Sequence, residues 1–275
     1  MSAPSAPTAA SRLARALPLP AGAGMARMLV ERNLRALRHG WLTVVSGFFE
    51  PVFYLFSLGV GIGALLGRID LGDGRSVEYA VFVAPALLAS SAMNGAVYDS
   101  TFNIFFKLKY AKLYDSVLAT PLGPRDVAVA EISWALLRGQ VYAAAFLLVA
   151  LAAGLVQSWW ALLALPAAGL VGFAFAAVGM AATTFMRGWT DFDYVQLAIL
   201  PLFLFSATFY PLSTYPEAVQ WLVRASPLYH GVALCRDLLL GSVDAGLLGH
   251  VAYLLVMGAL GFVVAARRLE RLLLS

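Results

Sequence analysis

The stretch LLGHVAYLLVMGALGFVVAA, residues 247–266, decides the structural class of this protein. It contains no Asp, Glu, Lys or Arg, and Arg267 and Arg268 follow it directly. A helix of about 20 mainly apolar residues is long enough to cross the roughly 30 Å hydrocarbon layer of a bilayer. The stretch therefore predicts a transmembrane helix with two arginines at one membrane surface.

Apolar stretches of this kind recur along most of the 275-residue chain, which is 61% hydrophobic and 12% charged. An ordinary soluble domain has about 25% charged residues and could not bury so much apolar surface. We therefore expect an all-α integral membrane protein with six transmembrane helices. These are predicted over residues 41–66, with an interruption at Glu50-Pro51, and over residues 79–97, 127–156, 159–186, 194–210 and 247–266.

The amino-terminal part precedes the first predicted span. Residues 1–24 are rich in Ala, Pro and Ser, and two prolines interrupt their only apolar run, so we expect a disordered cytoplasmic tail rather than a secretory signal. Over residues 25–38 the charged side chains fall on one helical arc, with Ala26, Leu29 and Val30 on the opposite arc. This pattern predicts an interfacial helix lying on the bilayer. Residues 25–275 are expected to form one transmembrane domain.

Two short segments separate the last two predicted spans. PEAVQWLVR (216–224) and LYHGVALCRDLLL (228–240) are apolar enough to enter a membrane, but each is too short to cross it. We expect a re-entrant or interfacial helical pair, and a seventh span is the alternative. Prolines break the helix before this pair, and aromatic side chains suit a membrane interface. The predicted external cap consists of Phe209, Tyr210, Pro211, Trp221 and Tyr229.

The distribution of Lys and Arg predicts the orientation. With the amino terminus inside, only Arg68, Arg75, Arg224 and Arg236 fall outside the cell, and the other basic residues of the transmembrane domain lie on the cytoplasmic side or within a span. Cytoplasmic loops of membrane proteins carry such an excess of basic residues. With six spans, both termini are then cytoplasmic in a multi-pass protein of the cell membrane.

Residues 99–126 form a mixed polar and apolar segment that holds all the lysines of the chain. As a helix, the segment would be amphipathic, with aromatic and branched side chains opposite the charged ones. Such a cytoplasmic helix can dock on a soluble partner, or it can rest on anionic lipid headgroups. The predicted docking residues are Phe106, Lys109, Tyr110, Lys112, Leu113, Tyr114 and Asp115, with Tyr110, Leu113 and Tyr114 as the anchors.

Three charged residues fall inside predicted spans. Glu50 and Arg138 lie at similar depths, and Glu131 precedes Arg138 by two turns on the same helix face. An unpaired charge at such a depth is unfavourable by roughly several kcal/mol, which is similar to the cost of burying an unpaired charge in a soluble protein. We therefore expect Glu50 and Arg138 to form a structural ion pair. The alternative is a role for these charges in substrate or proton binding.

The sequence contains none of the motifs that would give this chain its own chemistry. It lacks the Gly-Lys-Ser/Thr of a phosphate-binding loop, the Gly-x-Ser-x-Gly of a nucleophile elbow and the His-Glu-x-x-His of a metalloprotease. Cys235 is the only cysteine. We expect no enzyme activity, cofactor or metal in this chain, and the net charge of +4 follows from membrane insertion rather than from nucleic-acid binding.

Several motifs resemble those of the ABC-2 permeases, especially the branch that contains the nodulation-factor exporter membrane subunit and drug-resistance exporters. They include residues 82–134, EPVFYLFSLGVGIGALLG at 50–67, and the ordered elements FYP, YPEAVQW and SPLYH within residues 201–241. Ala207 departs from the pattern, because glycine is expected before the Thr-Phe-Tyr-Pro element.

The resemblance implies the six spans, the interfacial helix and the re-entrant pair. It also implies that Asn103–Val117 is a coupling helix, that Glu131 is the acidic residue following it, and that a permease dimer carries two ATPase subunits, which bind ATP and Mg²⁺. We expect an exporter of an amphipathic drug, lipid or glycan, most simply as a homodimer within membrane lipid. A secondary, ion-coupled transporter and a non-transporting scaffold are the rival hypotheses.

Overall fold

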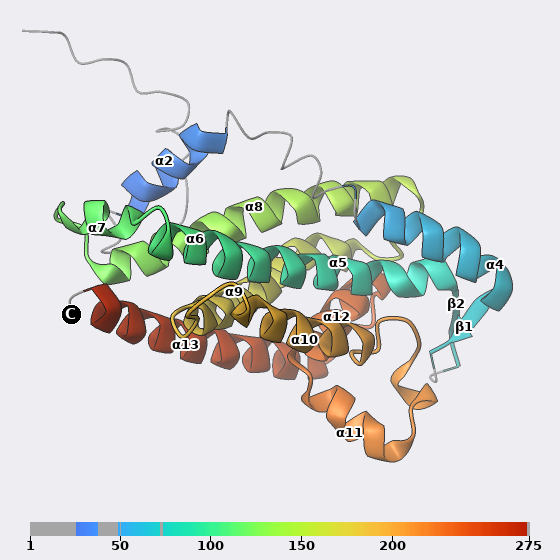
Figure 1. The fold of residues 1–275 in the computed structure, drawn as a ribbon. Helices are drawn as coiled ribbons and strands as arrows, with labels where there is room; N and C mark the ends of the chain where they lie inside the picture. The colour runs from blue at the N-terminus through green and yellow to red at the C-terminus, as the bar shows by residue number, and fades with distance from the viewer. Residues whose placement is uncertain (1–25, 38–48, 50, 72–73, 274–275) are drawn as a thin grey trace, which may run out of the picture.

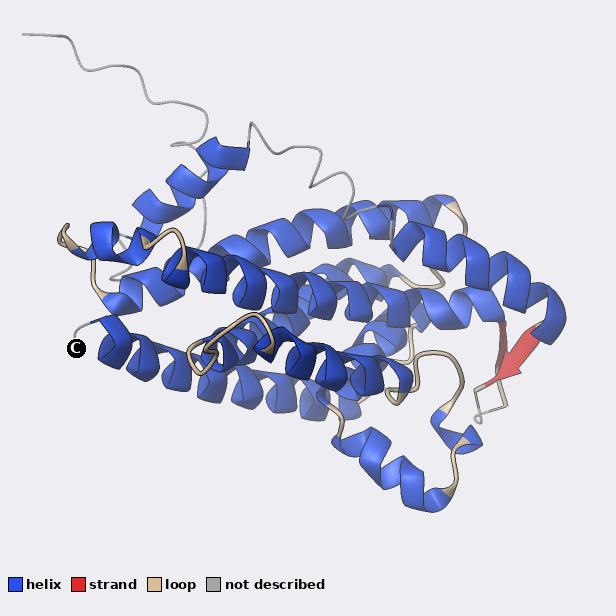
Figure 2. Ribbon diagram, viewed as in Figure 1, coloured by secondary structure: helices blue, strands red, loops and turns tan. Residues whose placement is uncertain are grey.

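The computed structural model describes residues 26–37, 49, 51–71 and 74–273. Long helices lie side by side in one bundle, and a small hairpin is the only strand structure among the described residues (Figures 1 and 2). Four helices are long and apolar enough to cross a membrane: Tyr79–Lys109, Pro124–Ala152, Trp159–Thr183 and Gly246–Leu273. The protein is therefore a mostly helical membrane protein, as the sequence predicts.

The helical elements follow one another closely along the chain. Their bounds are α2 Ala26–Leu37, η1 Ser57–Ile62, α4 Gly63–Leu66, α5 Tyr79–Tyr98, η2 Asp99–Asn103, α6 Ile104–Lys109, α7 Leu113–Leu118, α8 Pro124–Ala152, η3 Trp159–Leu163, α9 Ala164–Thr183, α10 Asp191–Leu204, η4 Leu212–Thr214, α11 Glu217–Ala225, α12 Pro227–Leu240 and α13 Gly246–Leu273. The elements η1 and η2 are π-helical. Helices α5, η2 and α6 form one continuous helix, Tyr79–Lys109, and η2 is a wider turn within it.

Helix α9 lies at the centre of the bundle and packs against α5, α8, α12 and α13. Its sequence, ALPAAGLVGFAFAAVGMAAT, is rich in small residues, most of which are buried. Lipid tails are as apolar as leucine, so helices in a membrane gain from close van der Waals packing, which small residues allow. Gly169, Gly172 and Gly179 each face a side chain of a neighbouring helix at short range, so these glycines allow close packing around α9.

The closest approach between α9 and α13 gives a direct test of this packing. A Cβ atom at Gly261 would lie 2.8 Å from the backbone nitrogen of Val178, whereas a Cβ atom at Gly249 of the same helix would meet nothing within 4 Å. We expect Gly261→Ala to lower the free energy of unfolding in detergent by about 1–3 kcal/mol. Gly249→Ala is the matched control and should leave it unchanged or raise it slightly. Equal effects of the two substitutions would contradict the close α9–α13 contact.

The described structure corrects the all-α prediction in one loop. Strand β1, Arg68–Asp70, pairs antiparallel with β2, Ser76–Glu78, in the register Arg68↔Glu78 and Asp70↔Ser76. The sequence predicted no strand between the first two spans, because three-residue strands are too short for a periodic pattern to emerge.

The fifth predicted span, residues 194–210, is also corrected. Helix α10 ends at Leu204, and the chain continues to Pro211 without helical structure. Pro201 removes a backbone donor near the carboxyl end of α10, and the chain leaves the helix a few residues later. Residues 41–48 and 50 of the first predicted span, and the tail 1–24, lie outside the described residues; the apolar helix Pro51–Leu66 covers the second part of that span.

Helix α2 forms where the amphipathic pattern predicted it, but its apolar face has a different partner. Ala26, Leu29 and Val30 are buried, and α2 packs against α8. This part of the apolar arc therefore contacts protein rather than lipid. An amphipathic pattern shows that one face leaves water, but it does not say what covers that face.

Candidate functional site

A cavity of about 750 Å³ lies between α5, α8, α10 and the Pro51–Leu66 helix. Its wall combines aromatic rings with amide, hydroxyl and guanidinium groups. The polar lining comes from Ser90, Ser91, Asn94, Arg138, Tyr142 and Gln196, and the aromatic lining from Tyr54, Tyr98, Phe102, Trp189, Phe192 and Phe203. A mixed surface of this kind at membrane depth can hold an amphipathic molecule, because it offers both apolar contact and hydrogen bonds.

Arg138, one of the residues predicted to carry an intramembrane charge, contributes to this cavity wall. Its Nη2 atom donates to Oδ1 of Asp99, which also accepts a 2.6 Å hydrogen bond from Nδ2 of Asn103. Asp99 is 5% exposed and lies in the π-helical turn η2. Single π-helical turns inside longer helices often occur at functional sites. Arg138 therefore joins α8 to the middle of the α5–α6 helix.

Asp99 is the residue that the sequence analysis missed at this site. It was assigned to the polar segment after the second span, whereas the structure continues that helix through Lys109. The expected partner of Arg138 was Glu50, which lies outside the described residues, so the Glu50–Arg138 contact stays a prediction. Asp99 is 39 residues from Arg138 in sequence, and no local pattern signals such a pair.

Glu131 connects α8 with both helices of the lysine-rich segment, α6 and α7. Its carboxylate accepts a 2.6 Å bond from Nζ of Lys107 on α6 and a 3.2 Å bond from the phenol of Tyr114 on α7. Glu131 and Tyr114 are 4% and 1% exposed. Burial, and then the charge of Glu131, raise the pKa of the Tyr114 phenol well above its ordinary value, so the phenol stays a hydrogen-bond donor.

The predicted coupling helix Asn103–Val117 is two helices rather than one. The helix is interrupted between α6 and α7, where Lys112 has a φ of +43°. The break turns Tyr114 inward toward Glu131, so Tyr114 is not available as a docking anchor, contrary to the prediction. Leu113 is half-buried, and the side chain of Asp115 is not among those described.

The exposed part of this segment forms an aromatic and basic surface, which we call the α6 surface and define as Phe106, Lys109, Tyr110 and Lys112. Phe106 and Tyr110 are 49% and 54% exposed, and their rings stack with centroids 6.0 Å apart. Tyr110 also stacks on Trp189, which lies just before α10, with ring centroids 5.4 Å apart. The surface is therefore fixed both to the long α5–α6 helix and to the segment before α10.

The residues predicted to form the external cap lie at the opposite end of the bundle from α6 and α7 (Figure 1). Phe209 packs edge-on against Phe203 at 5.1 Å, and the Tyr210 and Tyr215 rings are 4.7 Å apart. Pro211 precedes the short helix η4. Trp221 on α11 is 72% exposed, and Tyr229 on α12 is half-buried.

Ala207, in the turn before this cap, has a backbone conformation that glycine adopts more easily. Its φ is +52°, a conformation that costs residues with a side chain roughly 1–2 kcal/mol. Its carbonyl accepts a 2.8 Å hydrogen bond from Arg236, whose guanidinium carbon also lies 3.9 Å from the Phe82 ring centroid. The hydrogen bond from Arg236, a residue of α12, to the Ala207 carbonyl stabilises this turn.

Two histidines that are 20 residues apart in sequence are in contact. Nδ1 of His230 on α12 and Nδ1 of His250 on α13 are 2.7 Å apart, and the Tyr253 ring stacks on His230 with centroids 3.9 Å apart. One imidazole therefore donates and the other accepts. No group of three or more His, Cys, Asp or Glu residues that could hold a metal occurs among the described residues.

Comparison with known proteins assigns this architecture to a family. Residues 26–240 match the family described as ABC-2 type transporter. The chain is 31% identical to Nodulation protein J of Sinorhizobium fredii (strain NBRC 101917 / NGR234) over 246 residues, which cover 89% of this chain and 92% of that protein.

Nodulation protein J of Rhizobium leguminosarum bv. viciae is similar to the same extent, with 31% identity over 93% of this chain and 98% of the relative. The protein of that name from R. leguminosarum bv. trifolii is 32% identical over 88% of this chain and 92% of the relative. The family match covers more than half of the described chain, and these similarities extend over nearly all of each relative. The chain therefore belongs to the ABC-2 type transporter family, as the permease membrane subunit of an ABC transporter whose partner is an ABC ATPase.

Proposed function

We propose that this chain is the membrane subunit of an exporter that moves an amphipathic drug, lipid or glycan through the 750 Å³ cavity. Two copies of the chain form a homodimer, and two copies of a separate ATPase bind at the α6 surface and supply the energy of ATP hydrolysis. Six spans place both termini in the cytoplasm, and α11 and α12 form the re-entrant pair at the external end.

One observation carries this proposal: Phe106 and Lys109 of the α6 surface belong to the same continuous helix, Tyr79–Lys109, as one wall of the cavity. A helix transmits displacement along its axis, because each turn is hydrogen-bonded to the next. Movement of a partner against Phe106 and Tyr110 would therefore reach Asn94 and Tyr98 in the cavity wall. The π-helical turn η2, held by Arg138, provides a place where such a movement can change the shape of the cavity.

Glu131 supports the same mechanism from α8. It holds Lys107 and Tyr114 at the base of the α6 surface, so α8 moves with this surface. The α5 wall of the cavity is thus connected to the proposed ATPase contact through the continuous helix, and the α8 wall is connected to it through Glu131. A scaffold protein would have no need for a connection between a partner surface and an internal cavity.

Reconstitution with the co-purifying ATPase tests the proposal. The purified complex in proteoliposomes should move at least one of three fluorescent probes, a cationic dye, a labelled phospholipid or an acylated oligosaccharide, and transport should require hydrolysable ATP. Glu131→Gln should keep the ATPase bound while reducing the transport rate, because the ion pair with Lys107 is lost. Transport driven by an ion gradient without ATP would favour the secondary transporter, and a complex that moves none of the probes would favour the scaffold.

A further inference from the structure

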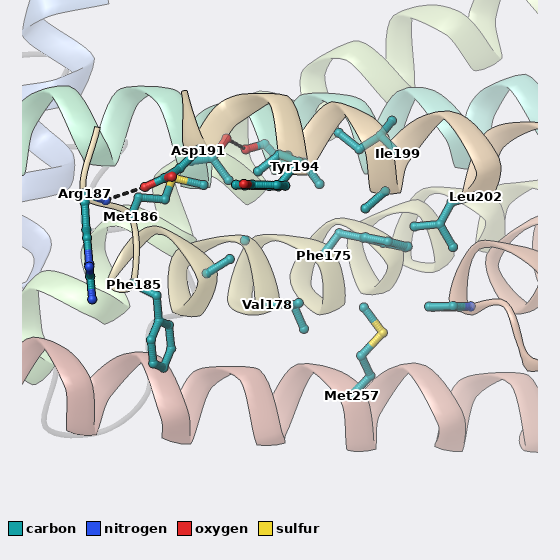
Figure 3. A pocket seen from close by; sticks show the side chains of 17 residues that line it. Phe175, Val178, Phe185, Met186, Arg187, Asp191, Tyr194, Ile199, Leu202 and Met257 are labelled. Atoms are coloured by element: carbon teal, nitrogen blue, oxygen red, sulfur yellow. Dashed lines mark hydrogen bonds between the residues drawn. The ribbon is translucent and has the colours of Figure 1, made fainter. Parts of the chain in front are cut away.

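A second hollow, which adjoins the polar cavity at Val97, Thr101, Val195 and Ile199, runs between α9, α10 and α13 and has a volume of about 680 Å³ (Figure 3). Its lining from α10 is a single stripe that recurs every three or four residues from Asp191 to Leu202, and a matching stripe from α9 runs from Phe175 to Ala182. Met257 of α13 lines the opposite side. The hollow is therefore a groove along the helices, and it is apolar for most of its length.

The length of the groove matches one leaflet of a membrane. Asp191 and Leu202 are eleven residues apart on one helix, which corresponds to about 16 Å at a rise of about 1.5 Å per residue. Half of the roughly 30 Å hydrocarbon layer is about 15 Å. The groove can thus accommodate an extended hydrocarbon chain that starts at one membrane surface and ends near the bilayer midplane.

Charged groups occur at only one end of the groove. Arg187 and Asp191 lie there, and Figure 3 shows Arg187 and Phe185 pointing to the same side, toward α13. Arg268 of α13 places its guanidinium carbon 4.1 Å from the centroid of the Phe185 ring and donates a 3.4 Å bond to the Thr184 carbonyl. The Arg268 guanidinium therefore lies against Phe185, and Arg187 lines the same end of the groove.

The local charge favours an anionic ligand. The carboxylate of Asp191 already accepts hydrogen bonds from the backbone N–H groups of Arg187 (2.5 Å) and Gly188 (3.3 Å), which hold its pKa below the ordinary value. The guanidinium of Arg268, unlike the Asp191 carboxylate, is not fully hydrogen-bonded, because its buried Nε has no partner among the described residues. The Nη2 atom of Arg268 makes only the long 3.4 Å bond to the Thr184 carbonyl, so it can also donate to a phosphate oxygen, and guanidinium groups are well suited to phosphate.

We propose that this groove binds an anionic phospholipid, with one acyl chain between α9 and α10 and its phosphate beside Arg187 and Arg268. The lipid comes from the leaflet at the end of the bundle that carries α6, α7 and the carboxyl terminus (Figure 1). Its chain fills apolar space that water would occupy only at a cost, and its headgroup fixes the segment that joins α9 to α10. The groove and the polar cavity share Val97, Thr101, Val195 and Ile199, whereas Ala182, Phe185 and Arg187 line only the groove.

Native mass spectrometry of the delipidated protein, with phosphatidylglycerol or phosphatidylcholine added at equal concentration, tests the headgroup site. We expect phosphatidylglycerol to bind about tenfold more tightly, the factor given by one charge-assisted contact. Arg187→Gln should remove most of this preference, and Arg187→Lys should restore part of it. Arg125→Gln, which neutralises an exposed arginine at the start of α8, is the matched control and should change nothing. Equal binding of the two lipids to the wild-type protein would overturn the proposal.

A second pair of variants tests the acyl-chain site. Ala182 is exposed and lines the groove, whereas Ala259 is exposed on α13 outside the lining of the groove. Ala182→Phe should abolish the binding of phosphatidylglycerol, and Ala259→Phe should leave it intact. Retention of the lipid by Ala182→Phe would overturn the proposal. A change from dimer to monomer in Ala182→Phe, with lipid binding unchanged, would assign the groove to a second copy of the chain instead.

Discussion

Replacement of Phe106 and Tyr110 by aspartate should abolish binding of the ATPase and transport together. Both rings are half-exposed on the α6 surface, and aromatic anchors of this kind often contribute at least about 2 kcal/mol each to an interface. Loss of about 4 kcal/mol corresponds to about a thousandfold weaker association. Pull-down of the ATPase from membranes that contain Phe106→Asp with Tyr110→Asp measures the effect, and the amount of inserted protein should not change.

Three controls make this result specific to the α6 surface. Phe106→Asp alone should already weaken association, because the only ring contact of Phe106 among the described residues is with Tyr110. Lys109→Gln with Lys112→Gln should have a smaller effect that depends on salt, since exposed charges mainly set the encounter rate. Trp221→Asp, which changes an exposed aromatic residue at the other end of the bundle, should leave the ATPase bound. Wild-type binding by the double aspartate variant would move the docking surface elsewhere.

Asp99→Asn should destabilise the protein strongly, because it leaves the guanidinium of Arg138 without its carboxylate partner inside the bundle. Removal of one member of a buried ion pair typically costs about 3–5 kcal/mol. Thermal unfolding of the purified protein in detergent should therefore occur at a clearly lower temperature. Arg138→Gln should have a similar effect, since Asp99 then keeps only its hydrogen bond with Asn103.

The double variant Asp99→Asn with Arg138→Gln separates a pair from two independent charges. We expect it to lose less stability than the sum of the single variants, because neither charge is left alone. Strictly additive losses would contradict the Asp99–Arg138 pair. Glu50→Gln offers a comparison: a loss of stability as large as that of Asp99→Asn, and absent in an Arg138→Gln background, would show that Glu50 shares Arg138.

Hydropathy and periodicity were enough to predict most of the helices. The stretches 127–156, 159–186 and 247–266 correspond to α8, to η3 with α9 and to α13. These features depend on short runs of sequence, because the apolar length needed to cross a bilayer is a local property. The bounds were less accurate where a helix continues beyond the apolar run, as α13 does through Leu273.

The chain's own contacts decided the roles of the individual site residues. Tyr114 and Tyr110 look alike on a helical projection, yet one is buried against Glu131 and the other is exposed beside Trp189. The break at Lys112 makes this difference, and it follows from backbone conformation rather than from the amphipathic pattern. Sequence periodicity assumes one uninterrupted helix, so it could not separate an internal contact from a docking anchor.

The sequence by itself determined that this chain enters a membrane, that it contains no phosphate-binding loop, and that it resembles the ABC-2 permeases. Only the tertiary structure decided which carboxylate meets Arg138, how Glu131 joins α8 to α6 and α7, and where the two hollows lie. The physical reason is that hydrophobic transfer depends on composition along a segment, whereas an ion pair or a groove depends on the rotation and separation of neighbouring helices. The π-helical turn at Asp99–Asn103 changes that rotation in the middle of the α5–α6 helix, and the pattern of apolar residues does not predict this turn.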